Sequence, residues 1–210
     1  MLLSDNGVRI VGMERFGPTR RGGPVFRWLG EPLAIDLANT IMVVKETEEI
    51  DLLGSDEEFR DWLEHERPRL GECSFALGRL EEIRAMRGAV RELFAAAAHA
   101  EALPSAAVDL VNAASAIAPV APQLDLSSEG GPRLVEMDSM EGISDLVGAV
   151  ARSAIRLIGD QGEAPINLCG APSCGMFFVG RRRWCCAACG NRARVARHYR
   201  RHAQPASRPR

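Results

Sequence analysis

Five of the six cysteines in this 210-residue chain lie within 21 residues, close enough together to bind a metal ion. They are Cys169, Cys174, Cys185, Cys186 and Cys189. In a cytosolic protein such a cluster favours metal ligation over disulfides, and Zn²⁺ prefers four soft ligands in a tetrahedron. We therefore predict one zinc site, in which Cys169 and Cys174 form one ligand pair and Cys189 belongs to the other. The spacing leaves open whether Cys185 or Cys186 completes the second pair.

Other uses of these thiols are weaker alternatives. Four thiolates also suit an iron–sulfur cluster, the vicinal pair Cys185 and Cys186 would suit a redox switch, and unrelated thiols can cluster without function. Zinc is favoured because a module of about forty residues cannot be stabilised by apolar burial alone. Zinc binding contributes ~10–16 kcal/mol in small fingers. A site closed by four thiolates leaves no open position for a substrate, so we expect a structural ion.

A loop, a short hairpin and a helix must bring these cysteines together. Turn-forming residues lie between Cys169 and Cys174. Residues 176–179 are typical of a strand, with which 181–184 would pair as an antiparallel partner. Helical spacing begins at Cys189, where the helix dipole favours a thiolate. This order predicts a small treble-clef-like zinc finger.

The charge of the chain is distributed unevenly. Residues 164–210 contain ten arginines and no acidic residue, which leaves 16 basic and all 28 acidic residues in 1–163. The net charge of −2 therefore divides into +10 and −12, and the basic part attracts polyanions. Arginine matches phosphate oxygens bidentately, and a helix with such a face can lie in a major groove.

We predict nucleic-acid contacts from the basic residues around this helix: Arg181, Arg182, Arg183, Arg192, Arg194, Arg197, His198, Arg200 and Arg201. The alternative is a solvated helix face that docks on the acidic N-terminal domain. Asn191 is expected either to contact a base or to cap the knuckle. Trp184 and Tyr199 are expected to pack the small core of the finger.

The preceding residues predict an α+β domain that is mostly helical and contains one β-hairpin. Leu33, Ile35 and Leu37 alternate as in a strand, whereas 38–44 is ambiguous. Ser55 and Glu58 have the spacing of a capping box. Helices are expected near 55–68, 75–102, 105–117 and 139–158, and a hairpin over 123–137. The expected organisation is a tail at 1–24, a domain at 25–160, a hinge at 159–162, a finger at 164–202 and a basic tail at 203–210.

The N-terminal domain contains no recognisable catalytic motif, so we do not expect an enzyme. Asp36, Asn39 and Thr40 follow the strand-like run and could face a ligand, although capping of a turn explains them as well. Cys73 is expected to be a small apolar residue in a helix. No apolar run approaches the ~20 residues of a membrane span, and the first residues lack a secretory signal. We therefore expect a cytoplasmic protein that does not bind membranes.

Two stretches resemble known families. Trp184-Cys185…Cys189-Gly190-Asn191-Arg192 resembles the CGNR zinc finger, and Gly30-Glu-Pro-Leu-Ala-Ile-Asp-Leu-Ala-Asn-Thr40 resembles the ABATE domain that usually precedes this finger. By position, the resemblance implies that Cys169, Cys174, Cys185 and Cys189 are the zinc ligands and that Cys186 is a spare thiol.

Members of this family are described as stress-induced bacterial transcription regulators. The resemblance implies DNA as the partner, one structural zinc ion, and an N-terminal domain that senses a small molecule or protein, or forms a homodimer. A zinc-stabilised module that binds protein or RNA is the competing interpretation, since such fingers serve all three partners.

Overall fold

The computed structural model describes residues 28–45, 48–70, 77–125, 132–137, 143–160, 162 and 164–202. Its helices are α1 (Leu33–Ala38), α2 (Asp56–Leu70), α3 (Leu80–His99), α4 (Ser105–Ile117), α5 (Ile143–Gly159) and α6 (Ala187–His202). Its strands form three antiparallel pairs: β1 (Ile41–Lys45) with β2 (Glu48–Asp51), β3 (Ala121–Asp125) with β4 (Arg133–Met137), and β5 (Ile166–Leu168) with β6 (Phe177–Val179). The fold is thus α+β, as expected. No described helix has the length and apolar character required to cross a membrane.

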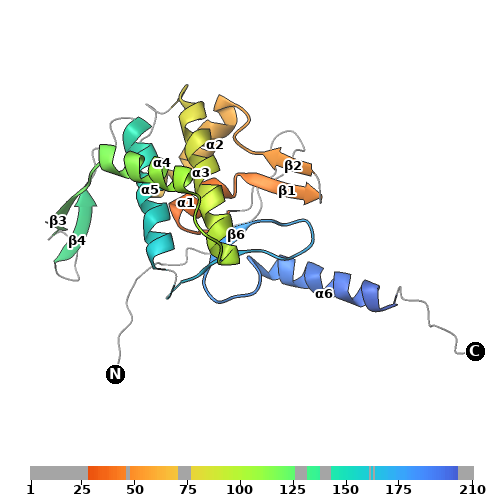
Figure 1. Cartoon of the computed structure of the whole chain (residues 1–210). Coiled ribbons are helices and arrows are strands. Elements are labelled where there is room, and N and C mark those ends of the chain that lie inside the picture. The colour runs from red at the N-terminus through yellow and green to blue at the C-terminus, as the bar shows by residue number, and fades with distance from the viewer. Residues whose placement is uncertain are drawn as a thin grey trace, which may run out of the picture.

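The main core surrounds the short helix α1. All six residues of α1 are buried, and the helix contacts α3, α5 and β6. Helices α3, α4 and α5 pack on one another beside it (Figure 1). The largest fully buried side chains of this core include Phe59, Phe94 and Leu146. The core also contains Ile166 and Phe177, which precede and follow the first two cysteines of the cluster.

The strand predicted from Leu33, Ile35 and Leu37 is wrong, because these residues belong to α1. Pro32 accepts the first backbone bonds of this helix through its carbonyl oxygen. The helix is buried on every side, so the small side chains Ala34 and Ala38 occupy core positions as well. A helix that is buried all round shows no amphipathic period. The remaining pattern, an alternation of large and small residues, is the one that a strand also shows, so it led to the wrong prediction.

The longer helices agree better with their sequence signals. Glu58 donates its backbone N–H to Ser55 Oγ at 3.2 Å, so Ser55 caps α2 as expected. The Glu58 carboxylate accepts from the Ser55 hydroxyl at 3.0 Å, in place of the Ser55 backbone N–H that a complete capping box would use. Helix α2 continues two residues beyond Pro68. Helix α4 has the expected bounds, and the hairpin β3–β4 confirms the one predicted over 123–137. Cys73 lies outside the described residues.

Strand β6 of the finger pairs with a different segment from the one expected. Strand β6 pairs with β5, which precedes the cysteines, and residues 181–184 form no strand. Gly180 has a φ of +100° and donates its N–H to the Pro165 carbonyl at 3.0 Å, while Asn167 Nδ2 donates to the Gly180 carbonyl at 2.8 Å. These bonds end the strand pair at Gly180, so the arginine run leaves it instead of returning along it.

Candidate zinc centre and cationic helix

The first two cysteines are held by a tight knuckle between β5 and β6. The backbone N–H of Cys169 donates to the Met176 carbonyl at 2.8 Å and closes the loop. Ser173 and Gly175 have φ values of +53° and +63°, so the chain reverses through left-handed backbone just around Cys174. A Cβ on Gly175 would lie 2.7 Å from Val43 Cγ2, so the knuckle also sits directly against β1. Glycine at this position is required by both conformation and space.

The second two cysteines lie at the start of α6. Cys185 precedes the helix and Cys189 lies in its first turn, four residues later. The Gly190 N–H donates to the Cys186 carbonyl at 3.2 Å, which continues the helical turn past both ligands. A Cβ on Gly190 would lie 3.1 Å from Trp184 Cδ1, so the indole covers this turn closely. Trp184 therefore packs the small core as expected.

The four sulfur atoms have the geometry of a tetrahedral metal site. The Sγ atoms of Cys169, Cys174, Cys185 and Cys189 lie within 4.8 Å of one another. The distances are 3.6 Å between Cys174 and Cys185, 3.4 Å between Cys185 and Cys189, and 3.6 Å between Cys189 and Cys174. A zinc–sulfur distance of ~2.3 Å implies tetrahedron edges of about 3.8 Å, so these sulfur atoms can all reach one ion.

The choice between Cys185 and Cys186 falls on Cys185 in this structure. Cys185 is buried within the cluster, whereas Cys186 is half-buried and lies outside the set of four, with its Sγ 3.9 Å from that of Cys185. The remaining three ligand candidates are buried too. Cys186 is therefore a neighbouring thiol, which agrees with the position-based expectation.

The chemistry of the donor set also fits a cation. Hydrogen bonds from the Cys174 and Cys185 thiols lower the pKa of Cys169, and the same bonds raise the pKa of Cys174 and Cys185. Four thiols in one buried site thus cannot all ionise without a positive ion between them. A dication would hold all four as thiolates and close the tetrahedron, which makes its role structural. We conclude that these cysteines hold one structural zinc ion.

Arg192 lies next to this centre. Its Nη2 atom donates to Cys189 Sγ at 3.0 Å. Burial lowers the pKa of the guanidinium, but the hydrogen bond and the charges of the nearby thiolates raise it by more, so the pKa lies above its ordinary value. Arg192 therefore supports a zinc ligand, although the sequence suggested that it contacts nucleic acid.

The finger is joined to the N-terminal domain by two polar side chains that flank α1. Asn39 Nδ2 donates to the Phe177 carbonyl at 2.9 Å, and Asn39 Oδ1 accepts from the Phe177 N–H at 2.8 Å. Glu31 Oε2 accepts from the Val179 N–H at 3.1 Å, and Glu31 Oε1 forms an ion pair with Arg182. Between these contacts the Phe177 ring lies edge-on to Phe94, with 5.8 Å between the ring centroids.

These joining contacts bear on two expectations. Both ends of the Asn39 amide bond the backbone of β6, which accounts for this polar side chain without a ligand. The hinge at 159–162 stays a prediction, and Ile166 and Phe177, which follow it, lie in the main core. The role of Glu31 was not predictable from the sequence, in which it is an acidic residue two positions before a mostly apolar helix.

Asp36 and Thr40 are also occupied within the fold. Thr40 Oγ1 donates to the Leu37 carbonyl at 2.7 Å and accepts from Arg87 Nη1 at 2.9 Å. Asp36 is buried and pairs with Arg69 at 2.5 Å. Burial raises the pKa of Asp36 to about 6, although Arg69 opposes this shift. These contacts are the kind that the capping alternative expects, in which both side chains satisfy groups within the fold.

The remaining basic residues are placed on or beside α6. Arg183 stacks over the Trp184 ring with 5.1 Å to the centroid, and Arg182 lies over the Phe178 ring at 4.9 Å. Asn191 is exposed. Tyr199 is 70% exposed, so the expectation that it packs the finger core is wrong. The exposed basic residues are Arg181, Arg182, Arg183, Arg194, Arg197, His198, Arg200 and Arg201.

Two family models match the chain. Residues 31–161 match ABATE, described as "Putative stress-induced transcription regulator". Residues 166–202 match the CGNR zinc finger. A comparison with curated proteins gave no match. The joining residues Glu31 and Asn39 lie within the first match, and all four zinc ligands lie within the second. The chain therefore belongs to the ABATE family and carries a CGNR zinc finger behind its ABATE domain.

Proposed function

We propose that this protein is a DNA-binding transcription regulator, in which the zinc centre presents α6 to DNA and the N-terminal domain senses a signal. The observation that carries this proposal is the exposed basic face of α6. The helix runs away from the other helices and ends far from the β3–β4 hairpin (Figure 1). Its first turn is fixed by the zinc ligands, so the helix is both exposed and firmly anchored.

The basic face contains Arg194, Arg197, His198 and Arg201. At 3.6 residues per turn these side chains occupy an arc of roughly 100°. All four are exposed, and no ion pair found in the described ranges uses any of the three arginines. Residues 164–210 include no acidic side chain, so nothing within the finger neutralises this face. Such a surface suits a phosphate backbone.

Arg200 is exposed on α6 but lies outside this arc. The arginines at or before the start of the helix divide into two groups. Arg181 and Arg183 lie exposed before the helix, where they can reach phosphates on the flank of a groove. Arg182 is paired with Glu31, and Arg192 with Cys189, so these two primarily stabilise the finger. We therefore assign DNA contact to Arg181, Arg183 and the basic face, and give Arg182 and Arg192 supporting roles.

Fluorescence anisotropy of the full zinc-loaded chain with labelled duplex DNA, over a salt series, tests this proposal. The double variant Arg197→Gln/Arg201→Gln should bind more weakly and should reduce the slope of log affinity against log salt by about 2, since each neutralised phosphate contributes about 0.9. The matched control is Arg60→Gln/Arg79→Gln, which removes two exposed charges outside the finger. Equal losses in both double variants, or no binding of the parent protein at moderate salt, would contradict DNA binding.

A specific observation favours a second candidate, a protein- or RNA-binding module. Val195 and Tyr199 lie four residues apart beside the basic face and are 54% and 70% exposed. An exposed apolar pair of this kind can pack on a partner protein or stack on an unpaired base. Structured RNA in the same anisotropy series distinguishes this candidate. Tighter binding of RNA than of duplex DNA, lost in Tyr199→Ala, would favour it.

A further inference from the structure

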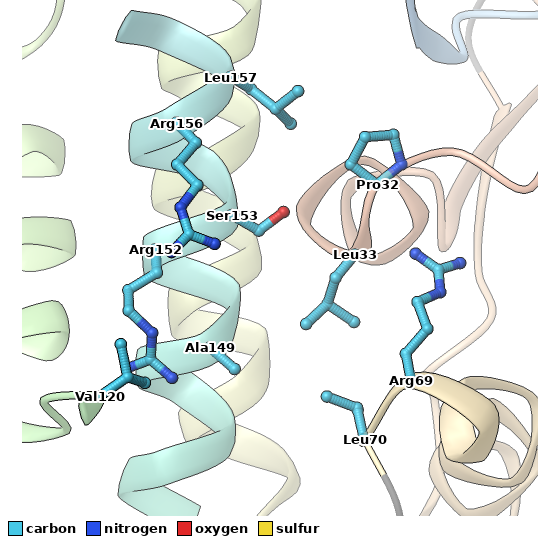
Figure 2. A pocket seen from close by; sticks show the side chains of 10 residues that line it. All are labelled: Pro32, Leu33, Arg69, Leu70, Val120, Ala149, Arg152, Ser153, Arg156 and Leu157. Atoms are coloured by element: carbon cyan, nitrogen blue, oxygen red, sulfur yellow. The ribbon is translucent and has the colours of Figure 1, made fainter. Parts of the chain in front are cut away.

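A cavity of about 420 Å³ opens between α1, the end of α2 and α5, and none of the four zinc ligands lines it (Figure 2). Its volume lies within the range of small-molecule sites, ~300–1,000 Å³. The apolar part of its lining consists of side chains from all three helices: Leu33, Leu70, Ala149 and Leu157. An apolar ligand body of modest size would therefore be covered on several sides.

Three arginines line the same cavity. Arg152 and Arg156 lie one turn apart on α5 along one wall, and Arg69 lies on the opposite wall at the end of α2 (Figure 2). No acidic side chain is among the lining residues in the described part of the chain. Arg152 also donates to the Ala118 carbonyl, which holds its side chain along the cavity wall. Two guanidinium groups one turn apart on a helix are suited to bind a carboxylate or phosphate.

The groups behind Arg69 neutralise its charge. Arg69 pairs with Asp36 at 2.5 Å and lies 3.1 Å from Glu66 Oε2, and both carboxyl groups are buried. Burial raises the pKa of Asp36 to about 6 and that of Glu66 to about 7, so near neutral pH Asp36 is mostly ionised and Glu66 is partly ionised. The cationic groups that the cavity offers to an anion are therefore Arg152 and Arg156 on α5.

We propose that this cavity binds a small organic anion, whose carboxylate or phosphate group pairs with Arg152 and Arg156 while its apolar body lies on Leu33, Ala149 and Leu157. The apolar lining distinguishes this ligand from inorganic phosphate or sulfate. Arg69 lines the other wall, where it bonds the Glu31 carbonyl and the Asp36 carboxylate.

The cavity is directly connected to the finger. Pro32 and Leu33 line the cavity, and Glu31 just before them holds Val179 and Arg182 of the finger. Arg69 Nη1 donates to the Glu31 carbonyl at 2.7 Å. A ligand that draws Arg69 toward the cavity therefore acts on the segment that anchors the finger. The statement that this anion is the signal of the regulator rests on the proposed function, whereas binding itself does not.

Thermal shift and calorimetry on the full zinc-loaded chain test the site with three anionic probes: 2-naphthoate, decanoate and phenyl phosphate. The neutral match is 2-naphthamide, and inorganic phosphate is the probe without an apolar body. We expect at least one organic anion to bind and raise the melting temperature, with at least tenfold weaker binding of the neutral amide and of inorganic phosphate.

Three variants localise the binding. Arg156→Gln, at an exposed position, should weaken it at least tenfold, and Ala149→Phe should abolish it by filling the cavity. Arg60→Gln serves as the control and should bind like the parent protein. Binding of none of the three organic anions, equal binding of acid and amide, or unchanged binding in both Arg156→Gln and Ala149→Phe would overturn the proposal.

Anisotropy with DNA, measured on the same preparations, separates the two proposals. An anion that binds without changing DNA affinity leaves the site in place and removes its regulatory role. DNA binding without any anion binding overturns the site and leaves the regulator intact. Anion binding in a protein that does not bind DNA removes the regulator and keeps the site.

Discussion

Arg192 shows how one side chain can serve a metal centre without being a ligand. Its hydrogen bond to Cys189 Sγ, at 3.0 Å, partly neutralises the negative charge that four thiolates leave around a dication. Groups that bond metal ligands in this way typically contribute 10–100-fold in metal affinity. The guanidinium is also half-buried, which shields the bond from solvent.

We therefore predict that Arg192→Gln lowers zinc affinity by about tenfold or more. Competition with a chromophoric chelator measures this change directly. Arg194→Gln is the matched control, because Arg194 lies on the same helix but is exposed and has no contact with a ligand sulfur. An equal effect of the two substitutions would mean that net charge, and not the hydrogen bond, is responsible.

Glu66 predicts a dependence of stability on pH. Burial raises its pKa from 4.5 to about 7, with Asp36 adding to the shift and Arg69 opposing it. Because the folded state holds this proton more tightly than the unfolded state, the contribution of Glu66 to stability is present below pH 4.5 and is lost as pH rises through 7. The loss is at most about 3 kcal/mol for a shift of this size.

Glu66→Gln should remove this dependence, since glutamine resembles the protonated acid. Urea denaturation at pH 5 and pH 8 measures the free energy of unfolding of both proteins. We expect the variant to gain stability relative to the parent as pH rises, whereas the titration of the cysteines affects both proteins alike. A difference between the proteins that stays constant over this range would contradict the raised pKa.

At the scale of elements, the hydrogen bonds of Asn39 join the turn after α1 to strand β6. Asn39 satisfies both backbone groups of Phe177 in a buried site, as a neighbouring strand would do. Removing the amide leaves a buried N–H and a buried carbonyl without partners, and each such group costs about 1–3 kcal/mol.

Asn39→Ala should therefore lower the free energy of unfolding by about 2–4 kcal/mol, as measured by chemical denaturation. Asn191→Ala is the control, because Asn191 is exposed on α6 and should change stability by less than about 0.5 kcal/mol. A loss below 1 kcal/mol in Asn39→Ala would show that the finger is held by Phe177 packing alone.

The elements that the sequence predicted well are those whose signals are local. The cap of α2 at Ser55, the bounds of α4 and the hairpin β3–β4 all follow from neighbouring residues. Cysteine spacing predicted the zinc site and three of its ligands, whereas the choice of Cys185 over Cys186 came from the family resemblance. Helix α1 was not, since complete burial removes its period. The pairing of β6 with β5 was not either, because the partner strand precedes the knuckle and is selected by Asn167 and Gly180.

Contacts across the molecule were the least predictable part. Arg182 and Arg192 looked like their exposed arginine neighbours in the sequence, and only the folded chain places Glu31 and Cys189 beside them. Asn39 likewise looked like a polar residue after a strand. Side chains that pair over 138 or 151 positions of sequence leave no periodic signal in a single chain.

At the scale of the whole molecule, the zinc centre has its own small core, which β5 and β6 connect to the main core through Ile166 and Phe177. The knuckle that it fixes ends in Phe177, which packs against Phe94 of α3, and begins after Ile166. Loss of the ion should therefore loosen more than the last forty residues. Residues 31–40 should also become less stable, because they contact β6 next to the zinc ligands.

We predict that chelation of zinc lowers the melting temperature of the whole chain and increases amide exchange in 31–40 and in α3 as well as in the finger. Hydrogen exchange with mass spectrometry on the full chain, with and without chelator, measures this. Cys174→Ser should reproduce the effect, whereas Cys186→Ser should not, because Cys186 is outside the ligand set. Faster exchange confined to 180–202 would contradict the coupling.

The packing of Phe177 and Ile166 into the domain has a consequence for transplanting the finger. Cut out at its family boundary and fused to another protein, the finger would expose an aromatic ring and an isoleucine that are buried here, and it would lose the carboxylate that neutralises Arg182. Such a chimera should aggregate unless the graft also brings a surface shaped like α1 and the turn that follows it. The ABATE domain and the zinc finger are therefore expected to be inherited together, because each covers buried side chains of the other.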